Sequence, residues 1–478
     1  MFINFMKNPS ILWFRVDLRL SDNPALQKAL ELGNPILPIY ILDDEDAENR
    51  KLGDASKWWL HSSLNKLSLE LEKIGSKLLF FRGKAESIIE KLAIETKADN
   101  ILWNRRYEPW AVKRDKIIKK NLLQLSKQVF SFNGSLLYEP WEVKSKTGNP
   151  LKVFTPYKNA ILNKGIDFKI TNSPKTIPFQ GKWPSCLTLD DLKLINNKPW
   201  SKKFYEFWEP GTETALKKVN AFKENSINSY NSDRNIPSLS GTSKLSPHLR
   251  FGEISPKQII MAISDLEEND DVMTYKSEII WREFSHNLLW YYPEIDTKPI
   301  KNDFLKFKWN NDENNFKLWT EGKTGYPIVD AGMRELWLTG WMHNRVRMIT
   351  ASFLTKHLLL PWQMGEKWFW NTLLDADPAS NTSGWQWVSG CGADAAPYFR
   401  IFNPTIQSQK FDPEGKYIKR FLPELKNLST KFIHEPWNAD SAILKNSDIK
   451  LGETYPMPII DHKFARERAL DSYAGIKN

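Results

Sequence analysis

Residues 10 to 133 alternate short apolar runs with amphipathic helical segments, and this alternation constrains the fold more than any other feature. Strands separated by helices of this length form a parallel, doubly wound sheet. The N-terminal part is therefore predicted to be an α/β domain. The expected strands are Ile11–Phe14, Ile36–Ile41, Lys77–Phe81, Asn100–Trp103 and Gln128–Phe132, and the expected helices are Pro24–Leu32, Ser56–Ile74, Ala85–Lys97 and Trp110–Leu125.

Polar residues follow three of these strands, at the edge of the sheet where ligands usually bind. In doubly wound sheets that edge is formed by the carboxyl ends of the strands. Here it carries Arg15–Asp17, Asp43–Asp44 and Asn104–Glu108. Neither a GxGxxG sequence nor a P-loop is present, so the pattern predicts a ligand site without a nucleotide fingerprint.

The composition changes after residue 133. Residues 134–205 are rich in Asn, Lys, Pro and Ser and show little periodicity, which predicts an ordered connector between domains. Beyond Gly211 the patterns are almost entirely helical. We therefore expect an α/β domain over residues 1–133, a linker over 134–205 and a larger all-α domain over 206–478. The expected apolar anchors of the linker are Val153, Phe154, Tyr157 and Trp183.

The composition also bears on partners and location. The net charge of +10 and the 21 Trp residues suit a protein that follows phosphates and stacks on bases, although core packing explains most aromatic residues. The two cysteines, Cys186 and Cys391, lie far apart, which speaks against a disulfide framework and a metal site. We find no signal-peptide pattern and no apolar run of 18 residues, so we expect a cytoplasmic protein without a membrane span.

The segment from Gly325 to Pro404 places polar side chains among Trp and other apolar residues. Buried polar groups need partners, so this density predicts a lined cavity rather than plain core. The segment reads GYPIVDAGMRELWLTGWMHNRVRMITASF and, further on, DADPASNTSGWQWVSGCGADAAPYFRIFNP. It resembles the flavin- and lesion-binding core of the DNA photolyase/cryptochrome family. The resemblance extends over almost the whole chain, and NRRYEPW, SPHLRFGEISP and WREFSHNLL are most similar to the bacterial class III cyclobutane-dimer photolyases.

The resemblance implies an FAD cofactor and residues that hold it. A loop such as GTSKLS (residues 241–246) is by itself more typical of a helix cap, but the matching family segment binds the FAD pyrophosphate. Two carboxylates in the spacing of LLDADPASN could otherwise indicate acid–base catalysis or a metal, and metal is not expected. The implied cofactor-binding residues are Tyr230, Thr242, Ser243, Lys244, Leu245, Ser246, Glu278, Arg282, Arg347, Asp375, Asp377 and Asn381, with Asp375 paired to Arg347 and Asn381 facing flavin N5.

The resemblance also implies a damaged-DNA substrate. In SEIIWREFSH, Glu278, Trp281 and Arg282 share one helix face, a pattern that alone suggests only an amphipathic helix with a Glu–Arg pair. Asn344 and Met348 stand where (6-4) repair enzymes carry histidines, which implies cyclobutane-dimer repair. The implied catalytic residues are Glu278, Trp281, Asn344, Met348 and Trp387, and the implied DNA contacts are Arg234, Arg345, Trp281 and Trp387.

Three Trp residues match the electron-transfer chain of the family, Trp385, Trp362 and Trp309 from inside to outside. A second, antenna chromophore is implied as well. Trp110 and Ala111 stand where many folate-binding class I members carry Asn-Glu, so a methenyltetrahydrofolate would be held by other contacts.

The resemblance thus implies a monomeric photolyase that transfers an electron from light-excited, reduced FAD to a flipped-out pyrimidine dimer. One alternative is a cryptochrome-type light sensor, which would share the fold, FAD and the Trp chain; the retained lesion contacts and the short C-terminal tail favour the enzyme. A basic single-strand-binding protein would explain the charge but not the acidic and Trp residues together.

Overall fold

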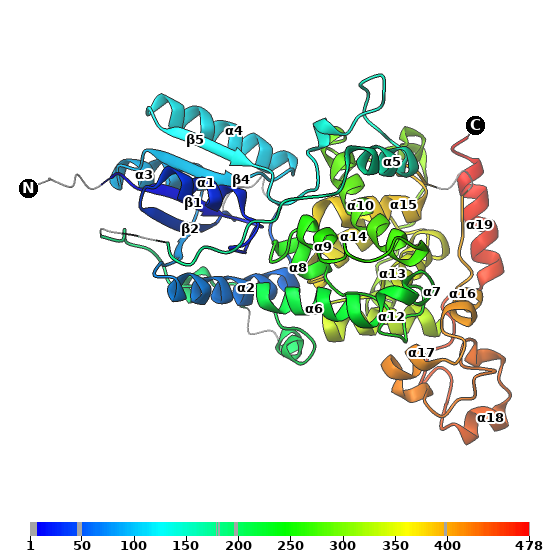
Figure 1. Ribbon diagram of the computed structural model, residues 1–478. Helices are drawn as coiled ribbons and strands as arrows, with labels where there is room; N and C mark the ends of the chain where they lie inside the picture. The colour runs from blue at the N-terminus through cyan, green and yellow to red at the C-terminus, as the bar shows by residue number, and fades with distance from the viewer. Residues whose placement is uncertain are drawn as a thin grey trace, which may run out of the picture.

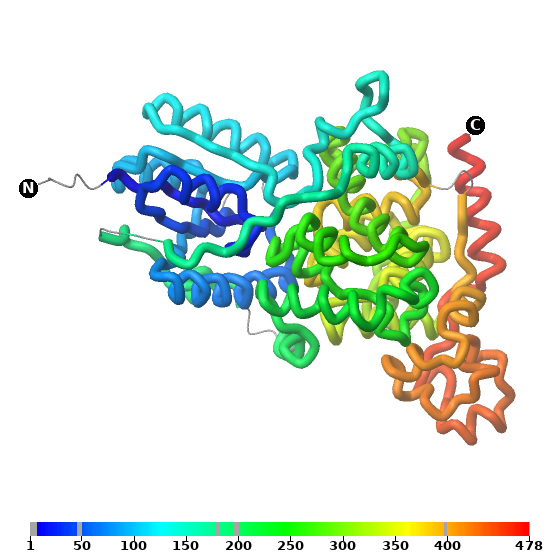
Figure 2. Tube along the Cα trace, viewed as in Figure 1, coloured from blue at the N-terminus to red at the C-terminus, as the bar shows by residue number. Residues whose placement is uncertain are grey.

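The computed structural model describes residues 7–44, 50–177, 179, 182–195, 199–395 and 399–477. An α/β part at the N-terminal end lies beside a larger helical part that continues to the C-terminus (Figure 1). Figure 2 shows the chain passing from the first part, blue to cyan, into the second, green to red. The predicted fold class is confirmed.

The α/β part is built on a five-stranded parallel sheet in the order β3-β2-β1-β4-β5. The central strand is buried along its length and pairs on both sides, so the chain changes direction across the sheet between β1 and β4. Every predicted strand and helix is present here, with ends shifted by at most two residues. The strands are β1 (Ser10–Phe14), β2 (Ile36–Leu42), β3 (Leu79–Arg82), β4 (Asn100–Asn104) and β5 (Gln128–Phe132), and the helices are α1 (Pro24–Leu32), α2 (Asp54–Lys73), α3 (Ala85–Glu95) and α4 (Pro109–Gln124).

The connecting segment is more structured than its composition predicts. It contains the helix α5 (Phe154–Lys164), which packs against α10 (Asp270–Tyr291). Phe154 and Tyr157 are buried as expected, and Trp183 packs on Phe179. Val153 is 46% exposed, so its predicted role as an anchor is wrong: it is the N-cap residue of α5, and the helix buries Phe154 instead.

The helical part places its longest helix, α10, beside α15 (Pro378–Ser389), and α12 (Pro327–Thr339) beside α13 (Asn344–Ser352). A π-helical turn, Phe353–His357, continues α13. The remaining helices are α6 (Thr212–Asn225), α7 (Tyr230–Asp233), α8 (Ser246–Phe251), α9 (Pro256–Ala262), α11 (Glu313–Thr320), α14 (Trp362–Thr372), α16 (Pro404–Phe411), α17 (Lys416–Phe421), α18 (Ser441–Asn446) and α19 (His462–Ala474).

One hydrophobic cluster joins the two parts. It contains Leu12 and Trp59 from the α/β part together with Phe251 and Leu374 from the helical part. Polar contacts follow the same seam: Trp59 Nε1 donates to Glu253 Oε1 at 3.2 Å. Residues of both parts therefore support the helices of the helical part near this seam. We keep the boundaries at 133 and 205 as our proposal.

No helix in the described part of the chain is long and apolar enough to cross a membrane. Within the same residues, no group of His, Cys, Asp and Glu side chains is arranged to hold a metal ion.

Candidate active site

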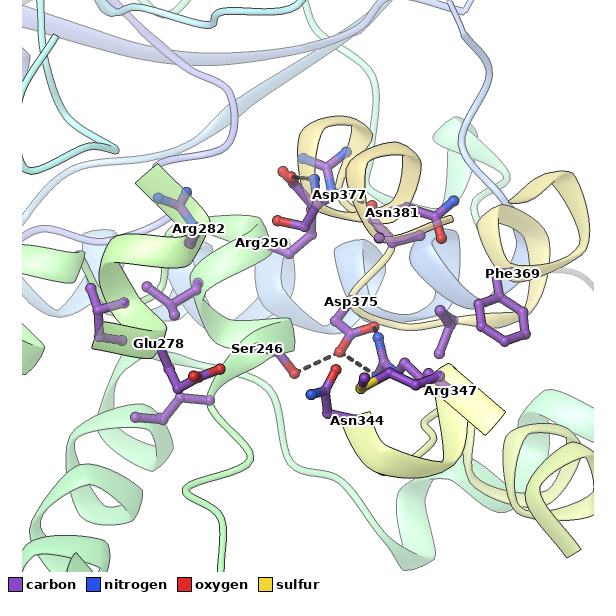
Figure 3. A pocket seen from close by; sticks show the side chains of 18 of the residues that line it. Ser246, Arg250, Glu278, Arg282, Asn344, Arg347, Phe369, Asp375, Asp377 and Asn381 are labelled. Atoms are coloured by element: carbon purple, nitrogen blue, oxygen red, sulfur yellow. Dashed lines mark hydrogen bonds and ion pairs between the residues drawn. The ribbon is translucent and has the colours of Figure 1, made fainter. Parts of the chain in front are cut away.

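A cavity of about 330 Å³ lies in the helical part, between α8, α10, α13 and α15 (Figure 3). Its size is within the range of small-molecule sites. Segments far apart in the sequence meet there, as the predicted lined cavity requires. The predicted residues that line it are Tyr230, Ser243, Leu245, Ser246, Glu278, Arg282, Asn344, Arg347, Met348, Asp375, Asp377, Asn381 and Trp385.

An ion pair between Arg347 and Asp375 forms part of the cavity wall. Arg347 donates from Nη1 and Nη2 to the two carboxylate oxygens of Asp375, at 3.1 and 2.8 Å, and Ser246 Oγ donates to the same carboxylate at 2.6 Å (Figure 3). The Arg347–Asp375 pairing is as predicted. A bidentate guanidinium–carboxylate pair fixes both side chains in orientation as well as in position. The cavity therefore has a preorganised charged wall.

The side chains of Asn344 and Met348 come from the first turns of α13. His343 caps this helix, because its Nδ1 accepts from Arg345 N at 3.2 Å. Asn344 and Met348 are four residues apart, so they project from the same helix face and both line the cavity. Burial, reinforced by Arg347, Arg345 and other cations, lowers the pKa of His343 to about 3. His343 is thus a neutral cap and not a titrating group at this site.

Asp377 begins α15 as its N-cap, accepting from Ser380 N at 2.8 Å. Burial works to raise the pKa of the Asp377 carboxyl, but His286, Arg250 and Arg282 outweigh it, so this pKa lies below its usual value. The His286 Nε2 atom lies 3.6 Å from Asp377. An anionic Asp377 therefore stands beside the cavity with its charge already balanced.

Asn381, one turn further along α15, is held by Glu366 of α14. Its Nδ2 atom donates to Glu366 Oε1 at 2.7 Å and to the Glu366 backbone oxygen at 3.0 Å. Glu366 is buried, and its other carboxylate oxygen pairs with Arg50 Nη2 at 2.6 Å. No sequence pattern indicates this support, since Arg50 and Glu366 are 316 residues apart.

On α10, Glu278 and Arg282 contact other segments and do not form the Glu–Arg pair that an amphipathic helix alone suggests. Glu278 pairs with Arg234 at 2.7 Å, and Arg282 donates to the backbone oxygen of Ser135 at 2.8 Å. Trp281 does not line the cavity; its ring stacks on Phe154 at 3.6 Å between centroids, nearly parallel. One face of Trp281 is thus already covered.

Other predicted residues lie around the cavity and not on its wall. Trp387 donates from Nε1 to the Asp394 backbone oxygen at 3.1 Å, and Lys244 lies over the Trp341 ring. Arg250, which the prediction missed, does line the cavity, and its Nε donates to Ala376 O at 2.6 Å. A sequence signal for Arg250 was available, because this residue belongs to SPHLRFGE, part of a segment that carries the family resemblance. The predicted residues that do not line the cavity are Arg234, Thr242, Lys244, Trp281, Trp309, Arg345, Trp362 and Trp387.

Trp385 and Trp362 are both buried in the main core of the helical part, against which Trp309 is partly buried. Only Trp385 reaches the cavity. Its ring lies edge-to-face with Trp319, 6.2 Å between centroids, a neighbour that the sequence prediction did not include. The indole Nε1 of Trp385 is buried and finds no acceptor among the described residues. A buried donor left unpaired beside a cavity suits a site built for a ligand.

A second cavity, of about 290 Å³, opens at the carboxyl ends of the sheet strands. Arg15, Asp43, Asp44 and Arg106 line it, so the predicted ligand edge does carry a cavity. Arginine and lysine side chains outnumber carboxylates on its wall. Its aromatic residues are Trp13, Tyr40, Trp110, Phe251 and Trp370. This lining suits an aromatic ligand with negative charge.

Comparison with known proteins matches both parts of the chain. A model described as DNA photolyase matches residues 10–176, and one described as the FAD binding domain of DNA photolyase matches residues 275–475. A deoxyribodipyrimidine photo-lyase of Agrobacterium fabrum is 48% identical, and the alignment covers 98% of each chain.

The chain belongs to the DNA photolyase/cryptochrome family.

Solved photolyase structures agree with this membership. A bacterial class III photolyase from Agrobacterium tumefaciens superposes with a TM-score of 0.95 at 48% identity over 98% of both chains. An archaeal photolyase from Sulfolobus tokodaii, described with two FAD molecules, superposes with a TM-score of 0.81 at 30% identity over 98% of this chain and all of that one. Within the family, cryptochrome-2 of Arabidopsis thaliana is 39% identical over 97% of this chain and 78% of its own length.

The first cavity fits the FAD that the matched domain binds in photolyases. Its wall offers three guanidinium groups (Arg250, Arg282, Arg347) and hydroxyls of Ser243 and Ser246 for a phosphorylated ligand, and the unpaired indole N–H of Trp385. In addition, a side-chain carbon built on Gly384 would meet no atom within 4 Å, so α15 leaves open space beside the cavity.

Proposed function

We propose that this protein is a deoxyribodipyrimidine photo-lyase that repairs cyclobutane pyrimidine dimers in DNA under light. The observation that carries the proposal is the first cavity, where the Arg347–Asp375 pair, Asn381 and the Asn344–Met348 face converge on one space. Relatives that cover almost the whole chain and carry this enzyme name support it. The reaction needs no nucleophile or general base from the protein, because the cofactor does the chemistry.

FAD is the cofactor, and when bound and reduced it supplies light absorption and the transferable electron. Arg347 and Asp375 fix the orientation of the bound group, and Asn381 Oδ1 offers it a hydrogen-bond acceptor. Ser243 and Ser246 line the part of the cavity next to the 241–246 loop, where they can donate to phosphate oxygens. Thr242 and Lys244 belong to the same loop but do not line the cavity.

The dimer is flipped out of the duplex into the same cavity, as the handling of a damaged base by photolyases requires. Glu278, Asn344 and Met348 form the wall that receives it. Glu278 accepts polar base edges, while Met348 offers a polarisable apolar contact. Because Arg234 pairs with Glu278 at 2.7 Å, it also places positive charge at the entrance.

DNA phosphates are bound around the entrance. A groove of about 770 Å³ is lined in part by Arg345, next to Asn344, and among the described residues its wall carries further cations and aromatic rings and no carboxylate. Phosphate contacts of this kind position the duplex and weaken as salt rises. Trp281 and Trp387 flank the cavity and provide aromatic surface for the flipped bases. The lining cations of the groove are Arg345, Arg400, Lys410, Arg466 and Lys477.

The second cavity holds the antenna chromophore, for which a methenyltetrahydrofolate has the right chemistry: an aromatic ring system with carboxylates. Trp110 lines this cavity and Arg106 lies over its ring at 4.5 Å, so the position that departs from the class I pattern is itself part of the site. The Sulfolobus photolyase, whose description names a novel light-harvesting cofactor, supports a second chromophore in this family. We further propose a monomer that acts in the cytoplasm.

The test is a blue-light repair assay with chemically reduced protein on two oligonucleotides, each with a dark control. One carries a thymine cyclobutane dimer and the other a (6-4) photoproduct. We expect light-dependent reversal of the cyclobutane dimer alone. Bound, photoreducible FAD without repair of either lesion would instead assign the chain to the light sensors among its relatives.

A further inference from the structure

The two cavities are connected by a short chain of polar side chains, Arg50, Glu366 and Asn381, of which Glu366 is buried. Arg50 lines the second cavity and Asn381 lines the first, and Glu366 lies between them. One Glu366 carboxylate oxygen pairs with Arg50 Nη2 at 2.6 Å, and the other accepts from Asn381 Nδ2 at 2.7 Å. A single carboxylate thus contacts a wall residue of each cavity.

Arg50 is held in place by more than this ion pair. Its guanidinium lies over the Trp370 ring, 3.9 Å from the ring centroid. Trp370, in turn, donates from Nε1 to the Lys51 backbone oxygen at 2.8 Å. A guanidinium has five N–H donors, and the pair with Glu366 leaves others for a ligand in the second cavity. An anionic ligand can therefore bind Arg50 without displacing Glu366.

Glu366 decides which atom Asn381 presents to the first cavity. The Asn381 Nδ2 group donates to both Oε1 and the backbone oxygen of Glu366, so both of its N–H bonds are used. Oδ1 is the atom left for a bound ligand. A hydrogen-bond acceptor at this point favours a ligand that carries an N–H, and the reduced flavin ring has an N–H where the oxidised ring has a bare nitrogen.

We propose that Arg50, Glu366 and Asn381 couple the second cavity to the redox state of the cofactor in the first. An anionic aromatic ligand that engages the remaining N–H donors of Arg50 further restrains Arg50 and Glu366, and so strengthens the hold on Asn381, whose Oδ1 faces the first cavity. Occupancy of the second cavity then stabilises reduced FAD, in addition to any light that its ligand collects. The inference rests on the proposed function, because it takes FAD and an antenna-type ligand as the two occupants.

Coupling between sites is reciprocal. If ligand binding favours reduced FAD by about fivefold, at the lower end of typical couplings, the reduced protein binds the ligand fivefold more tightly, and the FAD midpoint potential rises by about 20 mV for a two-electron couple. Glu366 and Arg50 act here as positioning residues, since of the three only Asn381 lines the first cavity.

The experiment measures the FAD midpoint potential of the holoprotein with and without saturating 5,10-methenyltetrahydrofolate. We expect the folate to raise the potential of the wild type. The shift should be lost in Arg50→Gln and in Glu366→Gln, which keeps the shape of that side chain but removes its charge. Arg82→Gln is the matched control: Arg82 also lines the second cavity but pairs with Asp44, so at saturating folate its shift should remain.

Three results would overturn the inference: equal potentials in the wild type with folate bound, a full shift in Arg50→Gln, or failure of the folate to bind the holoprotein. Each of these results comes from a measurement of potential or folate binding, and none depends on the outcome of the wild-type repair assay. Repair of the cyclobutane dimer without a potential shift would therefore leave the proposed function standing and remove only the coupling.

Discussion

At the scale of single residues, Asn344 and Met348 carry the argument for which lesion is repaired. Both line the cavity from one face of α13, and Glu278 of α10 lines the same cavity. Changing both to His replaces an amide and a flexible thioether by two rigid imidazole rings with different hydrogen bonds. We expect repair of the cyclobutane dimer to fall by at least about a hundredfold, because the lesion is no longer positioned for electron transfer. The measurement is single-turnover repair under blue light.

The FAD absorbance of the same Asn344→His, Met348→His variant is its control. The Arg347–Asp375 pair is untouched, so flavin should remain bound. The two single variants show whether one contact dominates. Undiminished dimer repair by the double variant would refute the link between this helix face and substrate choice.

At the scale of elements, α15 brings Asn381 and Trp385, four residues apart, to the cavity, so the proposed cofactor support and the proposed innermost electron donor share one helix. Trp385→Phe is expected to abolish photoreduction of oxidised FAD, because phenylalanine is much harder to oxidise than tryptophan. Repair by chemically reduced protein should persist. The measurement is flavin absorbance during blue illumination with an external reductant. Trp362→Phe should slow the same process, and a normal rate in Trp385→Phe would disprove the assigned chain.

The elements of the α/β part could be predicted almost to the residue because their signals are local. Asn23 caps α1 through its side chain, Pro24 begins the helix and Gly33 ends it in the left-handed region at a φ of 65°. The structure of the linker, residues 134–205, was harder to predict from the sequence. Its polar composition gives no indication of α5, because the burial of this helix depends on packing against the distant helix α10 and not on a pattern within the segment.

The candidate site likewise contains residues that the sequence indicates and residues that only the structure reveals. Motif resemblance indicated the residues of the first cavity, and the structure brings most of them together. Glu366 and Arg50 were missed because a buried ion pair between distant segments leaves no periodicity in either. The predicted contacts at Trp281 were incomplete for a similar reason: its stacking partner, Phe154, belongs to a segment with no motif of its own.

At the scale of the whole molecule, Glu283 ties the linker to the helical part by accepting from Leu137 N at 2.7 Å. Burial raises the pKa of Glu283 to about 7, against the pull of Arg282 and the backbone N–H groups. Between pH 4.5 and 7 the folded state then keeps a proton that the unfolded state has lost. The unfolding free energy should therefore fall as pH rises through this window, by up to about 3 kcal/mol from this group.

Glu283→Gln, which imitates the protonated side chain, should flatten this dependence, as measured by chemical denaturation between pH 5 and 8. Glu294→Gln is the control, because Glu294 is exposed and pairs only with Lys298 one turn away. An unchanged pH slope in Glu283→Gln would show that the carboxyl is ionised in the folded protein across the whole range.

The start of α2 has a consequence for how the molecule uses light. Gly53 lies so close to the backbone of Trp370 and Asn371 that a side-chain carbon there would overlap them, and Asp54 N donates to Asn371 Oδ1 at 3.1 Å. This close packing fixes the start of α2 against α14 and disfavours a hinge motion between the two parts. Two chromophores in the two cavities would keep a constant distance and a constant angle between their transition dipoles. The contributions of distance and orientation to excitation transfer between them would then be set by the fold.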